Sequence, residues 1–259
     1  MDLQLNDKLA VVTGSTAGIG YAIAEALAKE GARVIVNGRT QAAVNDAVSK
    51  IGHGTVGFAG DLSDAAKAAE LVRKYPDVDI LVNNLGIFEP KPFEEIPDDD
   101  WRRFFDVNVL SGARLAREYL PGMRRRDWGR IIFISSESGI QIPAEMIHYG
   151  MTKSAQISIA RGIAETLAGT RVTCNSVLPG PTQSRGVTDF VDQMAQTKKM
   201  SVEQVQKEFF EHVRPTSLLK RFITPEEVGN FVAFVASPLS AATNGAALRV
   251  DGGVLKGAY

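Results

Sequence analysis

Short apolar runs alternate along this chain with longer segments in which apolar residues recur at helical spacing. The short runs are rich in Val and Ile, which predicts buried β-strands, whereas the helical period of the longer segments predicts packed helices. The predicted strands are Leu9–Thr13, Arg33–Asn37, Thr55–Ala59, the run from Asp79 to Asn83, Ile131–Ile134, Val172–Leu178 and Ala246–Val250.

This alternation predicts an α/β fold with a Rossmann-type, doubly wound, seven-stranded parallel sheet, helices on both faces and right-handed crossovers. With 259 residues, of which 44% are apolar, the chain is long enough for one such domain with a large core. Neither an internal repeat nor a linker divides it. We therefore expect residues 1–259 to form a single domain.

One long segment between the last two predicted strands, at about 183–215, does not fit the simple alternation. Its apolar residues suggest amphipathic helices, and long segments at such places tend to be lids over a substrate. A fixed packing element is the alternative. The polar gap Gln196–Lys199 favours two mobile pieces.

The first predicted strand runs into a glycine-rich turn that opens a helix. The turn reads Gly14-Ser15-Thr16-Ala17-Gly18-Ile19-Gly20. Bare backbone N–H groups and a helix amino terminus together can hold a dinucleotide's pyrophosphate. An ordinary tight turn is the alternative, but the position between strand and helix favours cofactor binding.

The end of the second predicted strand indicates which dinucleotide binds. NAD-binding folds usually place a carboxylate there for the ribose 2′-hydroxyl, whereas NADP needs a cation for its 2′-phosphate. This chain has Arg39 and no acid at that place, so we predict NADP, with NAD as the alternative. Further along, Asp61 precedes Leu62 and could cap the next helix or bind adenine's amino group. Asn83 and Asn84 more often brace neighbouring backbone than touch substrate.

The stretch Ser136 to Lys153 carries the candidate chemistry. Ser136 follows the fifth predicted strand, and Tyr149 lies near a helix start, where open α/β sheets bind and transform ligands. A helical Tyr149 and Lys153 share one face, where the ammonium would favour phenolate and lower the phenol pKa. A surface tyrosine over a lysine is the alternative for this spacing alone.

Together these motifs resemble the short-chain dehydrogenase/reductase family, in particular its 3-oxoacyl-[acyl-carrier-protein] reductase-like members. One departure is Leu85, where the family usually has alanine, and the larger side chain could narrow the nicotinamide side of the pocket. The matching elements, in chain order, are Thr13-Gly14 to Gly20, Asp61, Asn83-Asn84-Leu85-Gly86, Asn108, Ser136, Tyr149 with Lys153, and Pro179-Gly180-Pro181-Thr182.

The resemblance implies a role for each matching residue. Tyr149 would give its proton to the developing alkoxide, Ser136 would polarise the substrate carbonyl, and Lys153 would lower the phenol pKa and hold the nicotinamide ribose. Asn108 would support a water that relays protons through the lysine. The expected cofactor contacts are Gly14, Ser15, Thr16, Gly18, Ile19, Gly20, Arg39, Asp61, Leu62, Asn84, Gly86, Tyr149, Lys153, Pro179, Gly180 and Thr182.

Three neighbouring polar residues compete for these roles. Ser135 and Ser138 flank Ser136, which we prefer because the family's spacing to the tyrosine fits it. His148 precedes Tyr149, but adjacent helical positions point about 100° apart, so we leave it out of the chemistry.

Composition excludes some partners. The formal net charge is −1 and the pI is about 6.3, so we expect neither nucleic acid nor membrane as a partner. One cysteine, Cys174, and three histidines supply no metal cluster. The start of the chain shows no targeting pattern, which predicts a cytoplasmic protein. The helix after Met146 is apolar over more than one stripe, and the resemblance implies a homo-oligomer of four chains.

We therefore expect an NADP(H)-dependent oxidoreductase that interconverts a carbonyl and a secondary alcohol. A partly apolar pocket would suit a 3-oxoacyl thioester or a cyclic ketone better than a sugar, with Phe88, Ile140 and the lid's Phe190, Met194 and Phe209 among its residues. The alternative is a catalytically idle dinucleotide-binding sensor or scaffold. That alternative predicts damage to the acid–base set, whereas all of its members are present.

Overall fold

The structure, a computed structural model, describes residues 1–183, 187, 195–197 and 200–258. Seven parallel strands form one sheet in the order β3-β2-β1-β4-β5-β6-β7, as the alternating pattern predicts. The strands are β1 Leu9–Val12, β2 Arg33–Gly38, β3 Val56–Ala59, β4 Ile80–Asn83, β5 Gly129–Ile134, β6 Val172–Pro179 and β7 Ala247–Val250.

The chain reverses its direction of travel across the sheet between β1 and β4. β1 pairs with β2 on one side and with β4 on the other, so the strands that follow β4 build outward in the opposite direction. In open α/β sheets ligands bind beyond the carboxyl ends of the strands at this switch point. The glycine turn after β1 and the polar residues after β4 and β5 therefore share one edge.

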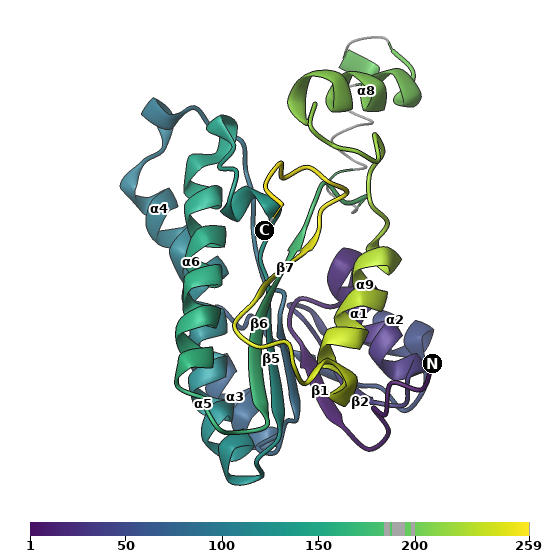
Figure 1. The fold of residues 1–259 in the computed structure, drawn as a ribbon, viewed down its shortest axis with the longest axis vertical. Coiled ribbons are helices and arrows are strands. Elements are labelled where there is room, and N and C mark those ends of the chain that lie inside the picture. Colours follow the sequence, from purple (N-terminus) through teal and green to yellow (C-terminus); the bar gives the residue numbers. More distant parts are fainter. Residues whose placement is uncertain (184–186, 188–194, 198–199, 259) are drawn as a thin grey trace.

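Helices cover both faces of the sheet (Figure 1). On one face lie α1 Gly18–Lys29, α2 Gln41–Ile51 and α9 Pro225–Ala236, and on the other lie α3 Ala65–Lys74, α4 Asp98–Phe105, α5 Ser111–Arg125 and α6 Ile147–Glu165. The short helix α8 Val202–Glu208 stands beyond the carboxyl edge of the sheet, at the top of Figure 1.

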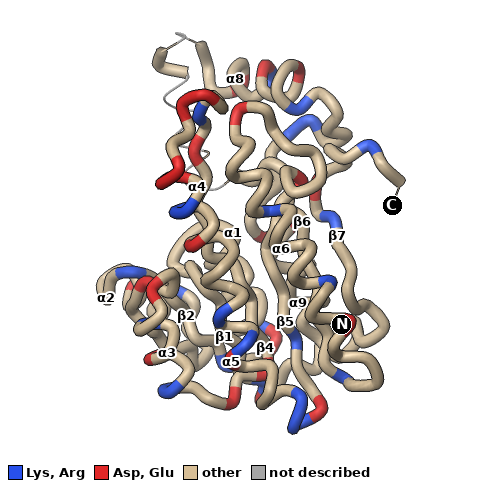
Figure 2. Tube along the Cα trace, turned by 90° about the vertical axis from the view of Figure 1, so that its left-hand side faces the viewer, with Lys and Arg blue, Asp and Glu red and all other residues tan. Residues whose placement is uncertain are grey.

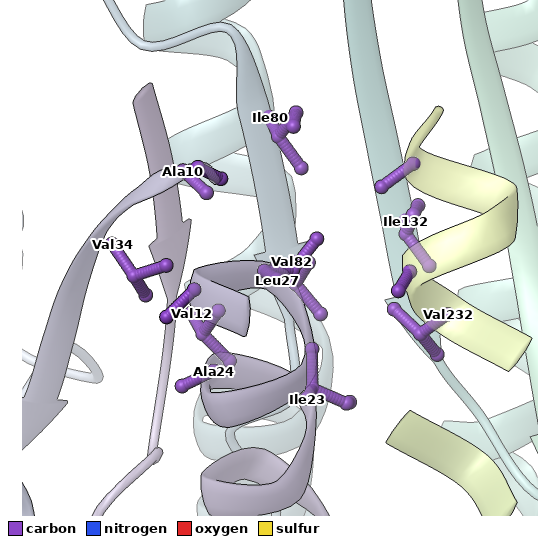
Figure 3. Close-up of a cluster of buried hydrophobic side chains, with 14 of the residues drawn as sticks. Ala10, Val12, Ile23, Ala24, Leu27, Val34, Ile80, Val82, Ile132 and Val232 are labelled. Atoms are coloured by element: carbon purple, nitrogen blue, oxygen red, sulfur yellow. The ribbon is translucent and has the colours of Figure 1, made fainter. Parts of the chain in front are cut away.

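Alternation of side chains along the strands builds a separate core on each face. Ala10 and Val12 of β1 join the core under α1 and α9, whereas Val11 between them joins the core under α3, α5 and α6. Figure 3 shows the first of these cores, where Ile23 and Val232 approach the strands. Burial of each such Ile or Leu side chain contributes roughly 1.5–3 kcal/mol. Because both faces are covered, the strands are almost continuously apolar.

The helical segment from Asp98 to Arg125 is divided rather than continuous. α4 leads into a π-helical turn, Asp106–Leu110, and α5 then continues through Pro121 to Arg125. The disturbance therefore lies at the π turn, where the Ser111 N–H donates to the Asp106 carbonyl five residues earlier. Such wide turns often occur at functional sites.

Lysines and arginines alternate with aspartates and glutamates along much of the chain (Figure 2). The acidic run Asp98–Asp100 opens α4, where carboxylates suit the positive end of the helix dipole. None of the helices within the described ranges is both long and apolar enough to span a membrane. Cys174 is buried in β6, as expected.

Candidate active site

The glycine turn after β1 has the geometry that an anion site needs. Gly14 and Gly18 have φ values of +60° and +56°, a region that side chains disfavour. A Cβ at Gly20 would lie 2.5 Å from the Gly14 carbonyl oxygen, so this position needs glycine. No side chain caps the amino terminus of α1 at Ala17, which leaves its first N–H groups directed out of the helix. The residues present therefore fit a pyrophosphate.

Three polar side chains hold this turn in place. Ser15 Oγ donates to the Val12 carbonyl at 2.6 Å, and Asn37 Oδ1 accepts from the Gly14 N–H at 3.1 Å. Asn84 Nδ2 donates to the carbonyls of Thr13 and Gly14 at 2.9 and 3.1 Å. Asn84 thus braces backbone, which was the more common interpretation of the amide pair. The side chains of Ser15 and Asn84 thus hold the backbone of the expected cofactor site in place.

The end of β2 presents a free cation. Arg39 is exposed, and within the described part of the chain its guanidinium has no hydrogen-bond or ion-pair partner. Gly38 precedes it, and a Cβ there would lie 2.4 Å from Thr16 Cγ2. Thr16 of the glycine turn and the end of β2 are therefore in close contact. This geometry fits a 2′-phosphate between the turn and Arg39.

The other expected adenine-side contacts differ in what they offer. Asp61 Oδ1 accepts from the N–H and the hydroxyl of Ser63, and Asp64 rather than Asp61 caps α3. The cap role for Asp61 was therefore wrong, because the helix begins a few residues later. Leu62 is completely buried in the core, so its side chain cannot line a cofactor site. Ile19 packs partly against the opposite core.

The turn after β6 lies close to the last strand. A Cβ at Gly180 would meet the Asp251 carbonyl oxygen at 2.5 Å, so glycine lets Pro179 and the turn approach β7. Thr182 is buried, and its hydroxyl donates to the Gly180 carbonyl at 2.8 Å. The Thr182 hydroxyl therefore already has an acceptor within this turn.

Ser136 follows β5 and caps a short 3₁₀ helix, Glu137–Gly139. Its hydroxyl accepts from the Ser138 N–H at 3.1 Å and donates to the Glu137 carboxylate. Ser136 lies near enough to Tyr149 to lower the pKa of the tyrosine. Ser135, the competitor on the other side, donates its hydroxyl to the Lys153 carbonyl at 2.8 Å. Ser136 is thus the serine that faces Tyr149.

Tyr149 and Lys153 lie on one face of α6, as their spacing predicts. Lys153 Nζ lies 5.6 Å from the centre of the Tyr149 ring, and Phe88 meets the same ring edge-on at 6.3 Å. A Cβ at Gly86 would lie 3.5 Å from Lys153 Nζ. Gly86, which follows Asn83-Asn84-Leu85, therefore brings the backbone beside Lys153.

The ionisation of this pair differs from the sequence-based expectation. Burial, and then the Glu137 carboxylate, raise the pKa of Tyr149 above its ordinary value, whereas Ser136 and the Arg214 guanidinium lower it less. Burial also lowers the pKa of Lys153 to about 7. The predicted lowering of the phenol pKa was wrong, because burial of Tyr149 outweighs the groups that lower its pKa. Tyr149 is therefore protonated at neutral pH.

Asn108 lies within the π-helical turn and is almost completely buried. Its side-chain oxygen accepts from the Ile87 N–H at 2.7 Å, and its Nδ2 donates to the Ile87 carbonyl and to Thr152 Oγ1 at 2.9 and 3.0 Å. The Asn108 side chain therefore ties the loop after β4 to α6. Its backbone carbonyl remains for other partners.

Two charged residues at the site were missed by the sequence analysis. Glu137 is buried beside Ser136, and Arg214, which follows α8 by a π-helical turn, Phe209–Val213, contacts it with Nε 3.2 Å from the carboxylate. Arg214 also reaches Glu145, at 3.2 Å. Since 77 positions separate Glu137 from Arg214, only the fold brings them together.

Other expected residues lie elsewhere. His148 is buried against Phe104, with ring centres 4.0 Å apart, and burial lowers its pKa, which agrees with leaving it out of the chemistry. Phe209 meets Phe210 edge-on and packs against Phe222 in a small separate cluster. Phe190 and Met194 of the predicted lid lie outside the described residues.

Comparison with known proteins now identifies the family. A family model described as enoyl-(acyl carrier protein) reductase matches residues 14–255. YvaG, an oxidoreductase of Bacillus subtilis, is 48% identical over 264 residues and covers 100% of both chains. The chain belongs to the short-chain dehydrogenase/reductase family. As a short-chain dehydrogenase/reductase it is an oxidoreductase that acts on CH–OH groups and their carbonyl counterparts.

Two further short-chain dehydrogenases/reductases show the range of similar proteins. D-β-hydroxybutyrate dehydrogenase of Cupriavidus necator is 36% identical over 256 residues, which are 96% of this chain and 98% of that protein. The crystal structure of L-sorbose reductase from Gluconobacter frateurii, complexed with NADPH and L-sorbose, superposes with a TM-score of 0.93 at 30% identity and covers 99% of this chain and 100% of that chain.

Proposed function

We propose that this chain is an NADP(H)-dependent oxidoreductase that interconverts a ketone or aldehyde carbonyl and an alcohol, working mainly as a reductase. One observation carries the proposal: Ser136, Tyr149 and Lys153 converge beside Gly86 at the edge of the sheet that holds the glycine turn. When bound, the cofactor supplies the hydride. The protonated state of Tyr149 near neutral pH supports reduction, because that direction needs an acid.

The chain's own groups divide the remaining work. Tyr149 gives its phenolic proton to the oxygen of the carbonyl as negative charge develops there. Ser136 donates a hydrogen bond to the same oxygen and polarises the carbonyl. Lys153 Nζ donates to the Ile134 carbonyl at 2.9 Å and to a side-chain amide on α6, which leaves one N–H for a ribose hydroxyl. Asn108 holds the loop that carries Gly86.

The preference for NADP(H) rests on Arg39. Arg39 is exposed and follows Gly38, which lies against Thr16 of the glycine turn. Its guanidinium would pair with the ribose 2′-phosphate of NADP. Bidentate, charge-assisted hydrogen bonds to phosphate suit arginine, and a bare ribose hydroxyl offers no comparable partner. NAD remains a weaker second cofactor.

The substrate side combines apolar and charged groups. Phe88, which meets the Tyr149 ring edge-on, is exposed, and so are Ile140 and Ile142 in the stretch between Ser136 and Tyr149. These apolar side chains suit a partly apolar ketone such as a 3-oxoacyl thioester or a cyclic ketone. Glu137 and Arg214, beside Ser136, favour a second class, hydroxylated ketones. The contact of Arg214 with Glu137 supports a lid role for the 183–215 segment.

We also propose that the protein works as a homo-oligomer of four chains. Phe105, at the end of α4, is 44% exposed, and contact with another chain would remove this apolar surface from water. Light scattering during size-exclusion chromatography measures the mass directly, and a monomer at micromolar concentration would contradict this part of the proposal.

The proposed function is tested by initial rates of NADPH and NADH oxidation against a carbonyl panel. The panel contains a 3-oxoacyl thioester, a cyclic ketone, a hydroxylated ketone and an aldehyde. We expect turnover with NADPH, and Arg39→Ala should raise the KM for NADPH roughly 10- to 100-fold while leaving NADH kinetics unchanged. An unaltered NADPH preference in Arg39→Ala would contradict the cofactor assignment.

An idle sensor or scaffold is the competing function. It predicts that the wild-type chain binds NADPH yet reduces no carbonyl of the panel. The intact set of Ser136, Tyr149, Lys153 and Asn108 speaks against it, since an idle protein has no need for these groups.

A further inference from the structure

Gln156 is a buried polar residue that the proposed mechanism does not yet use. It lies on α6 with 1% of its surface exposed. Its Oε1 accepts from Lys153 Nζ at 3.2 Å, and its Nε2 donates to the Asn108 carbonyl oxygen. We propose that Gln156 is a positioning residue for Lys153, which it ties through one side-chain amide to the π-helical turn.

The spacing along α6 makes this contact natural. Gln156 follows Lys153 by three positions, so the two side chains lie on the same helix face. The other acceptor of Lys153, the Ile134 carbonyl, belongs to β5. Gln156 and Ile134 together hold the ammonium from two directions and direct its remaining N–H away from both.

The π-helical turn explains why the Asn108 carbonyl can accept a hydrogen bond from Gln156. A bond that spans five residues, from the Ser111 N–H to Asp106, widens the helix there. Side chains then satisfy carbonyls of the turn, since Ser111 Oγ donates to Val107 at 2.6 Å and Gln156 donates to Asn108. A buried carbonyl without a hydrogen-bond partner costs free energy, so the Asn108 carbonyl needs the donor that Gln156 provides.

Only one orientation of the Gln156 amide satisfies both partners. Lys153 offers donors alone, and a backbone carbonyl offers an acceptor alone. Turning the amide over would place donor against donor and acceptor against acceptor. An amide therefore fits this position, whereas an apolar side chain of the same size would remove the donor to the Asn108 carbonyl and one of the two acceptors of Lys153.

The resemblance implies that the matching asparagine supports a water that relays protons through the lysine. In this chain the Gln156 side chain spans the Asn108 carbonyl and the Lys153 ammonium directly. Gln156 thus fixes the lysine to the scaffold and favours its charged form.

Several charged groups face Lys153 and must be considered with it. Burial is the main cause that lowers the pKa of Lys153, to about 7, and the Glu137 carboxylate opposes it. Tyr149 lies one turn earlier on the same helix. Arg214, in the segment after α8, pairs with Glu137. Replacing Gln156 leaves these groups in place, so a change in titration reports the lost amide.

The direct test is an NMR titration of Lys153 in the intact chain carrying isotope-labelled lysine. The signal is assigned by its loss in Lys153→Met. In Gln156→Met, which keeps the size but removes both hydrogen bonds, we expect the Lys153 midpoint to fall by roughly one pH unit. Gln156→Glu keeps an acceptor for the ammonium, so its midpoint should not fall. Ile163→Ala, on the same helix but packed against the core, should leave it unchanged.

Steady-state kinetics give the second measurement, which rests on the proposed function. A smaller charged fraction of Lys153 stabilises the Tyr149 phenolate less. In Gln156→Met the pH midpoint for alcohol oxidation should therefore move upward. In Gln156→Glu it should not. If Lys153 titrates as expected but no variant or wild type turns over a carbonyl or alcohol, the proposed function fails while this inference stands. If Lys153 titrates alike in wild type and Gln156→Met, the inference is wrong whatever the activity.

Discussion

Two groups of polar side chains flank Tyr149, and they handle charge differently. The amide cluster, Lys153, Gln156 and Asn108, surrounds one cation with neutral acceptors and holds it on rigid elements, α6 and the π-helical turn. The ionic cluster, Glu137 and Arg214 beside Ser136, balances a carboxylate with a guanidinium that comes from the segment after α8.

The difference separates two tasks of the site. Neutral amides position the lysine without adding a charge that would compete with the phenolate. The carboxylate of Glu137, by contrast, opposes ionisation of Tyr149, and the Arg214 guanidinium paired with it offsets part of that effect. We therefore expect the amide cluster to set the proton chemistry and the ionic cluster to make that chemistry depend on the segment after α8.

Among changes in the ionic cluster, the largest effect should come from Arg214→Leu. This change leaves the buried Glu137 carboxylate unpaired beside Tyr149, and removal of one partner from a buried pair is strongly unfavourable. We expect kcat for reduction to fall roughly 10- to 100-fold, equivalent to about 1.4–2.8 kcal/mol, and the alcohol-oxidation midpoint to move to higher pH. Initial rates against pH measure both.

Arg221→Leu is the matched control for this variant. It breaks an ion pair with Glu227 in which both side chains are more than 40% exposed, away from Tyr149. Its rates should stay within about twofold of wild type, because exposed pairs contribute little. Equal losses in the two variants would mean that Arg214 has no special link to the site.

A smaller effect is expected when the carboxylate is removed as well. Glu137→Gln in the Arg214→Leu background eliminates the unpaired charge, so most of the lost rate should return. A double-mutant cycle of the single and double variants measures the coupling. If the losses in rate of the two single variants add in the double variant, Glu137 and Arg214 act independently. The proposal that the ionic cluster acts as one unit would then be wrong.

The smallest effect should come from Glu145→Gln. Glu145 also contacts Arg214, but its side chain is 45% exposed, so solvent screens the pair. We expect less than a threefold change in kcat for the hydroxylated ketone or any other substrate that turns over. A loss as large as that of Arg214→Leu would move the centre of the ionic cluster from Glu137 to Glu145.

The sequence predicts most of the scaffold, because local patterns determine it. The alternation of β1 to β7 with helices, the glycine turn and the shared face of Tyr149 and Lys153 follow from spacing alone. Arg39 was found by the same kind of argument, from its place at the end of β2. These features need no knowledge of distant contacts.

Features that depend on distant partners could not be predicted in this way. Gln156 looks like one more polar residue of α6 until the π-helical turn places the Asn108 carbonyl beside it. Glu137 and Arg214 meet only through the fold. The direction of the Tyr149 pKa depends on burial, which spacing does not reveal, so local reasoning from Lys153 alone was wrong.

The most direct test of the account compares wild type with Tyr149→Phe in carbonyl reduction by NADPH, with NADPH affinity measured alongside. The account predicts that the rate falls 10²- to 10⁴-fold, roughly the usual contribution of a general acid, while affinity changes by less than about fivefold. A variant that reduces the same carbonyl at the wild-type rate would contradict the central claim that Tyr149 supplies the proton.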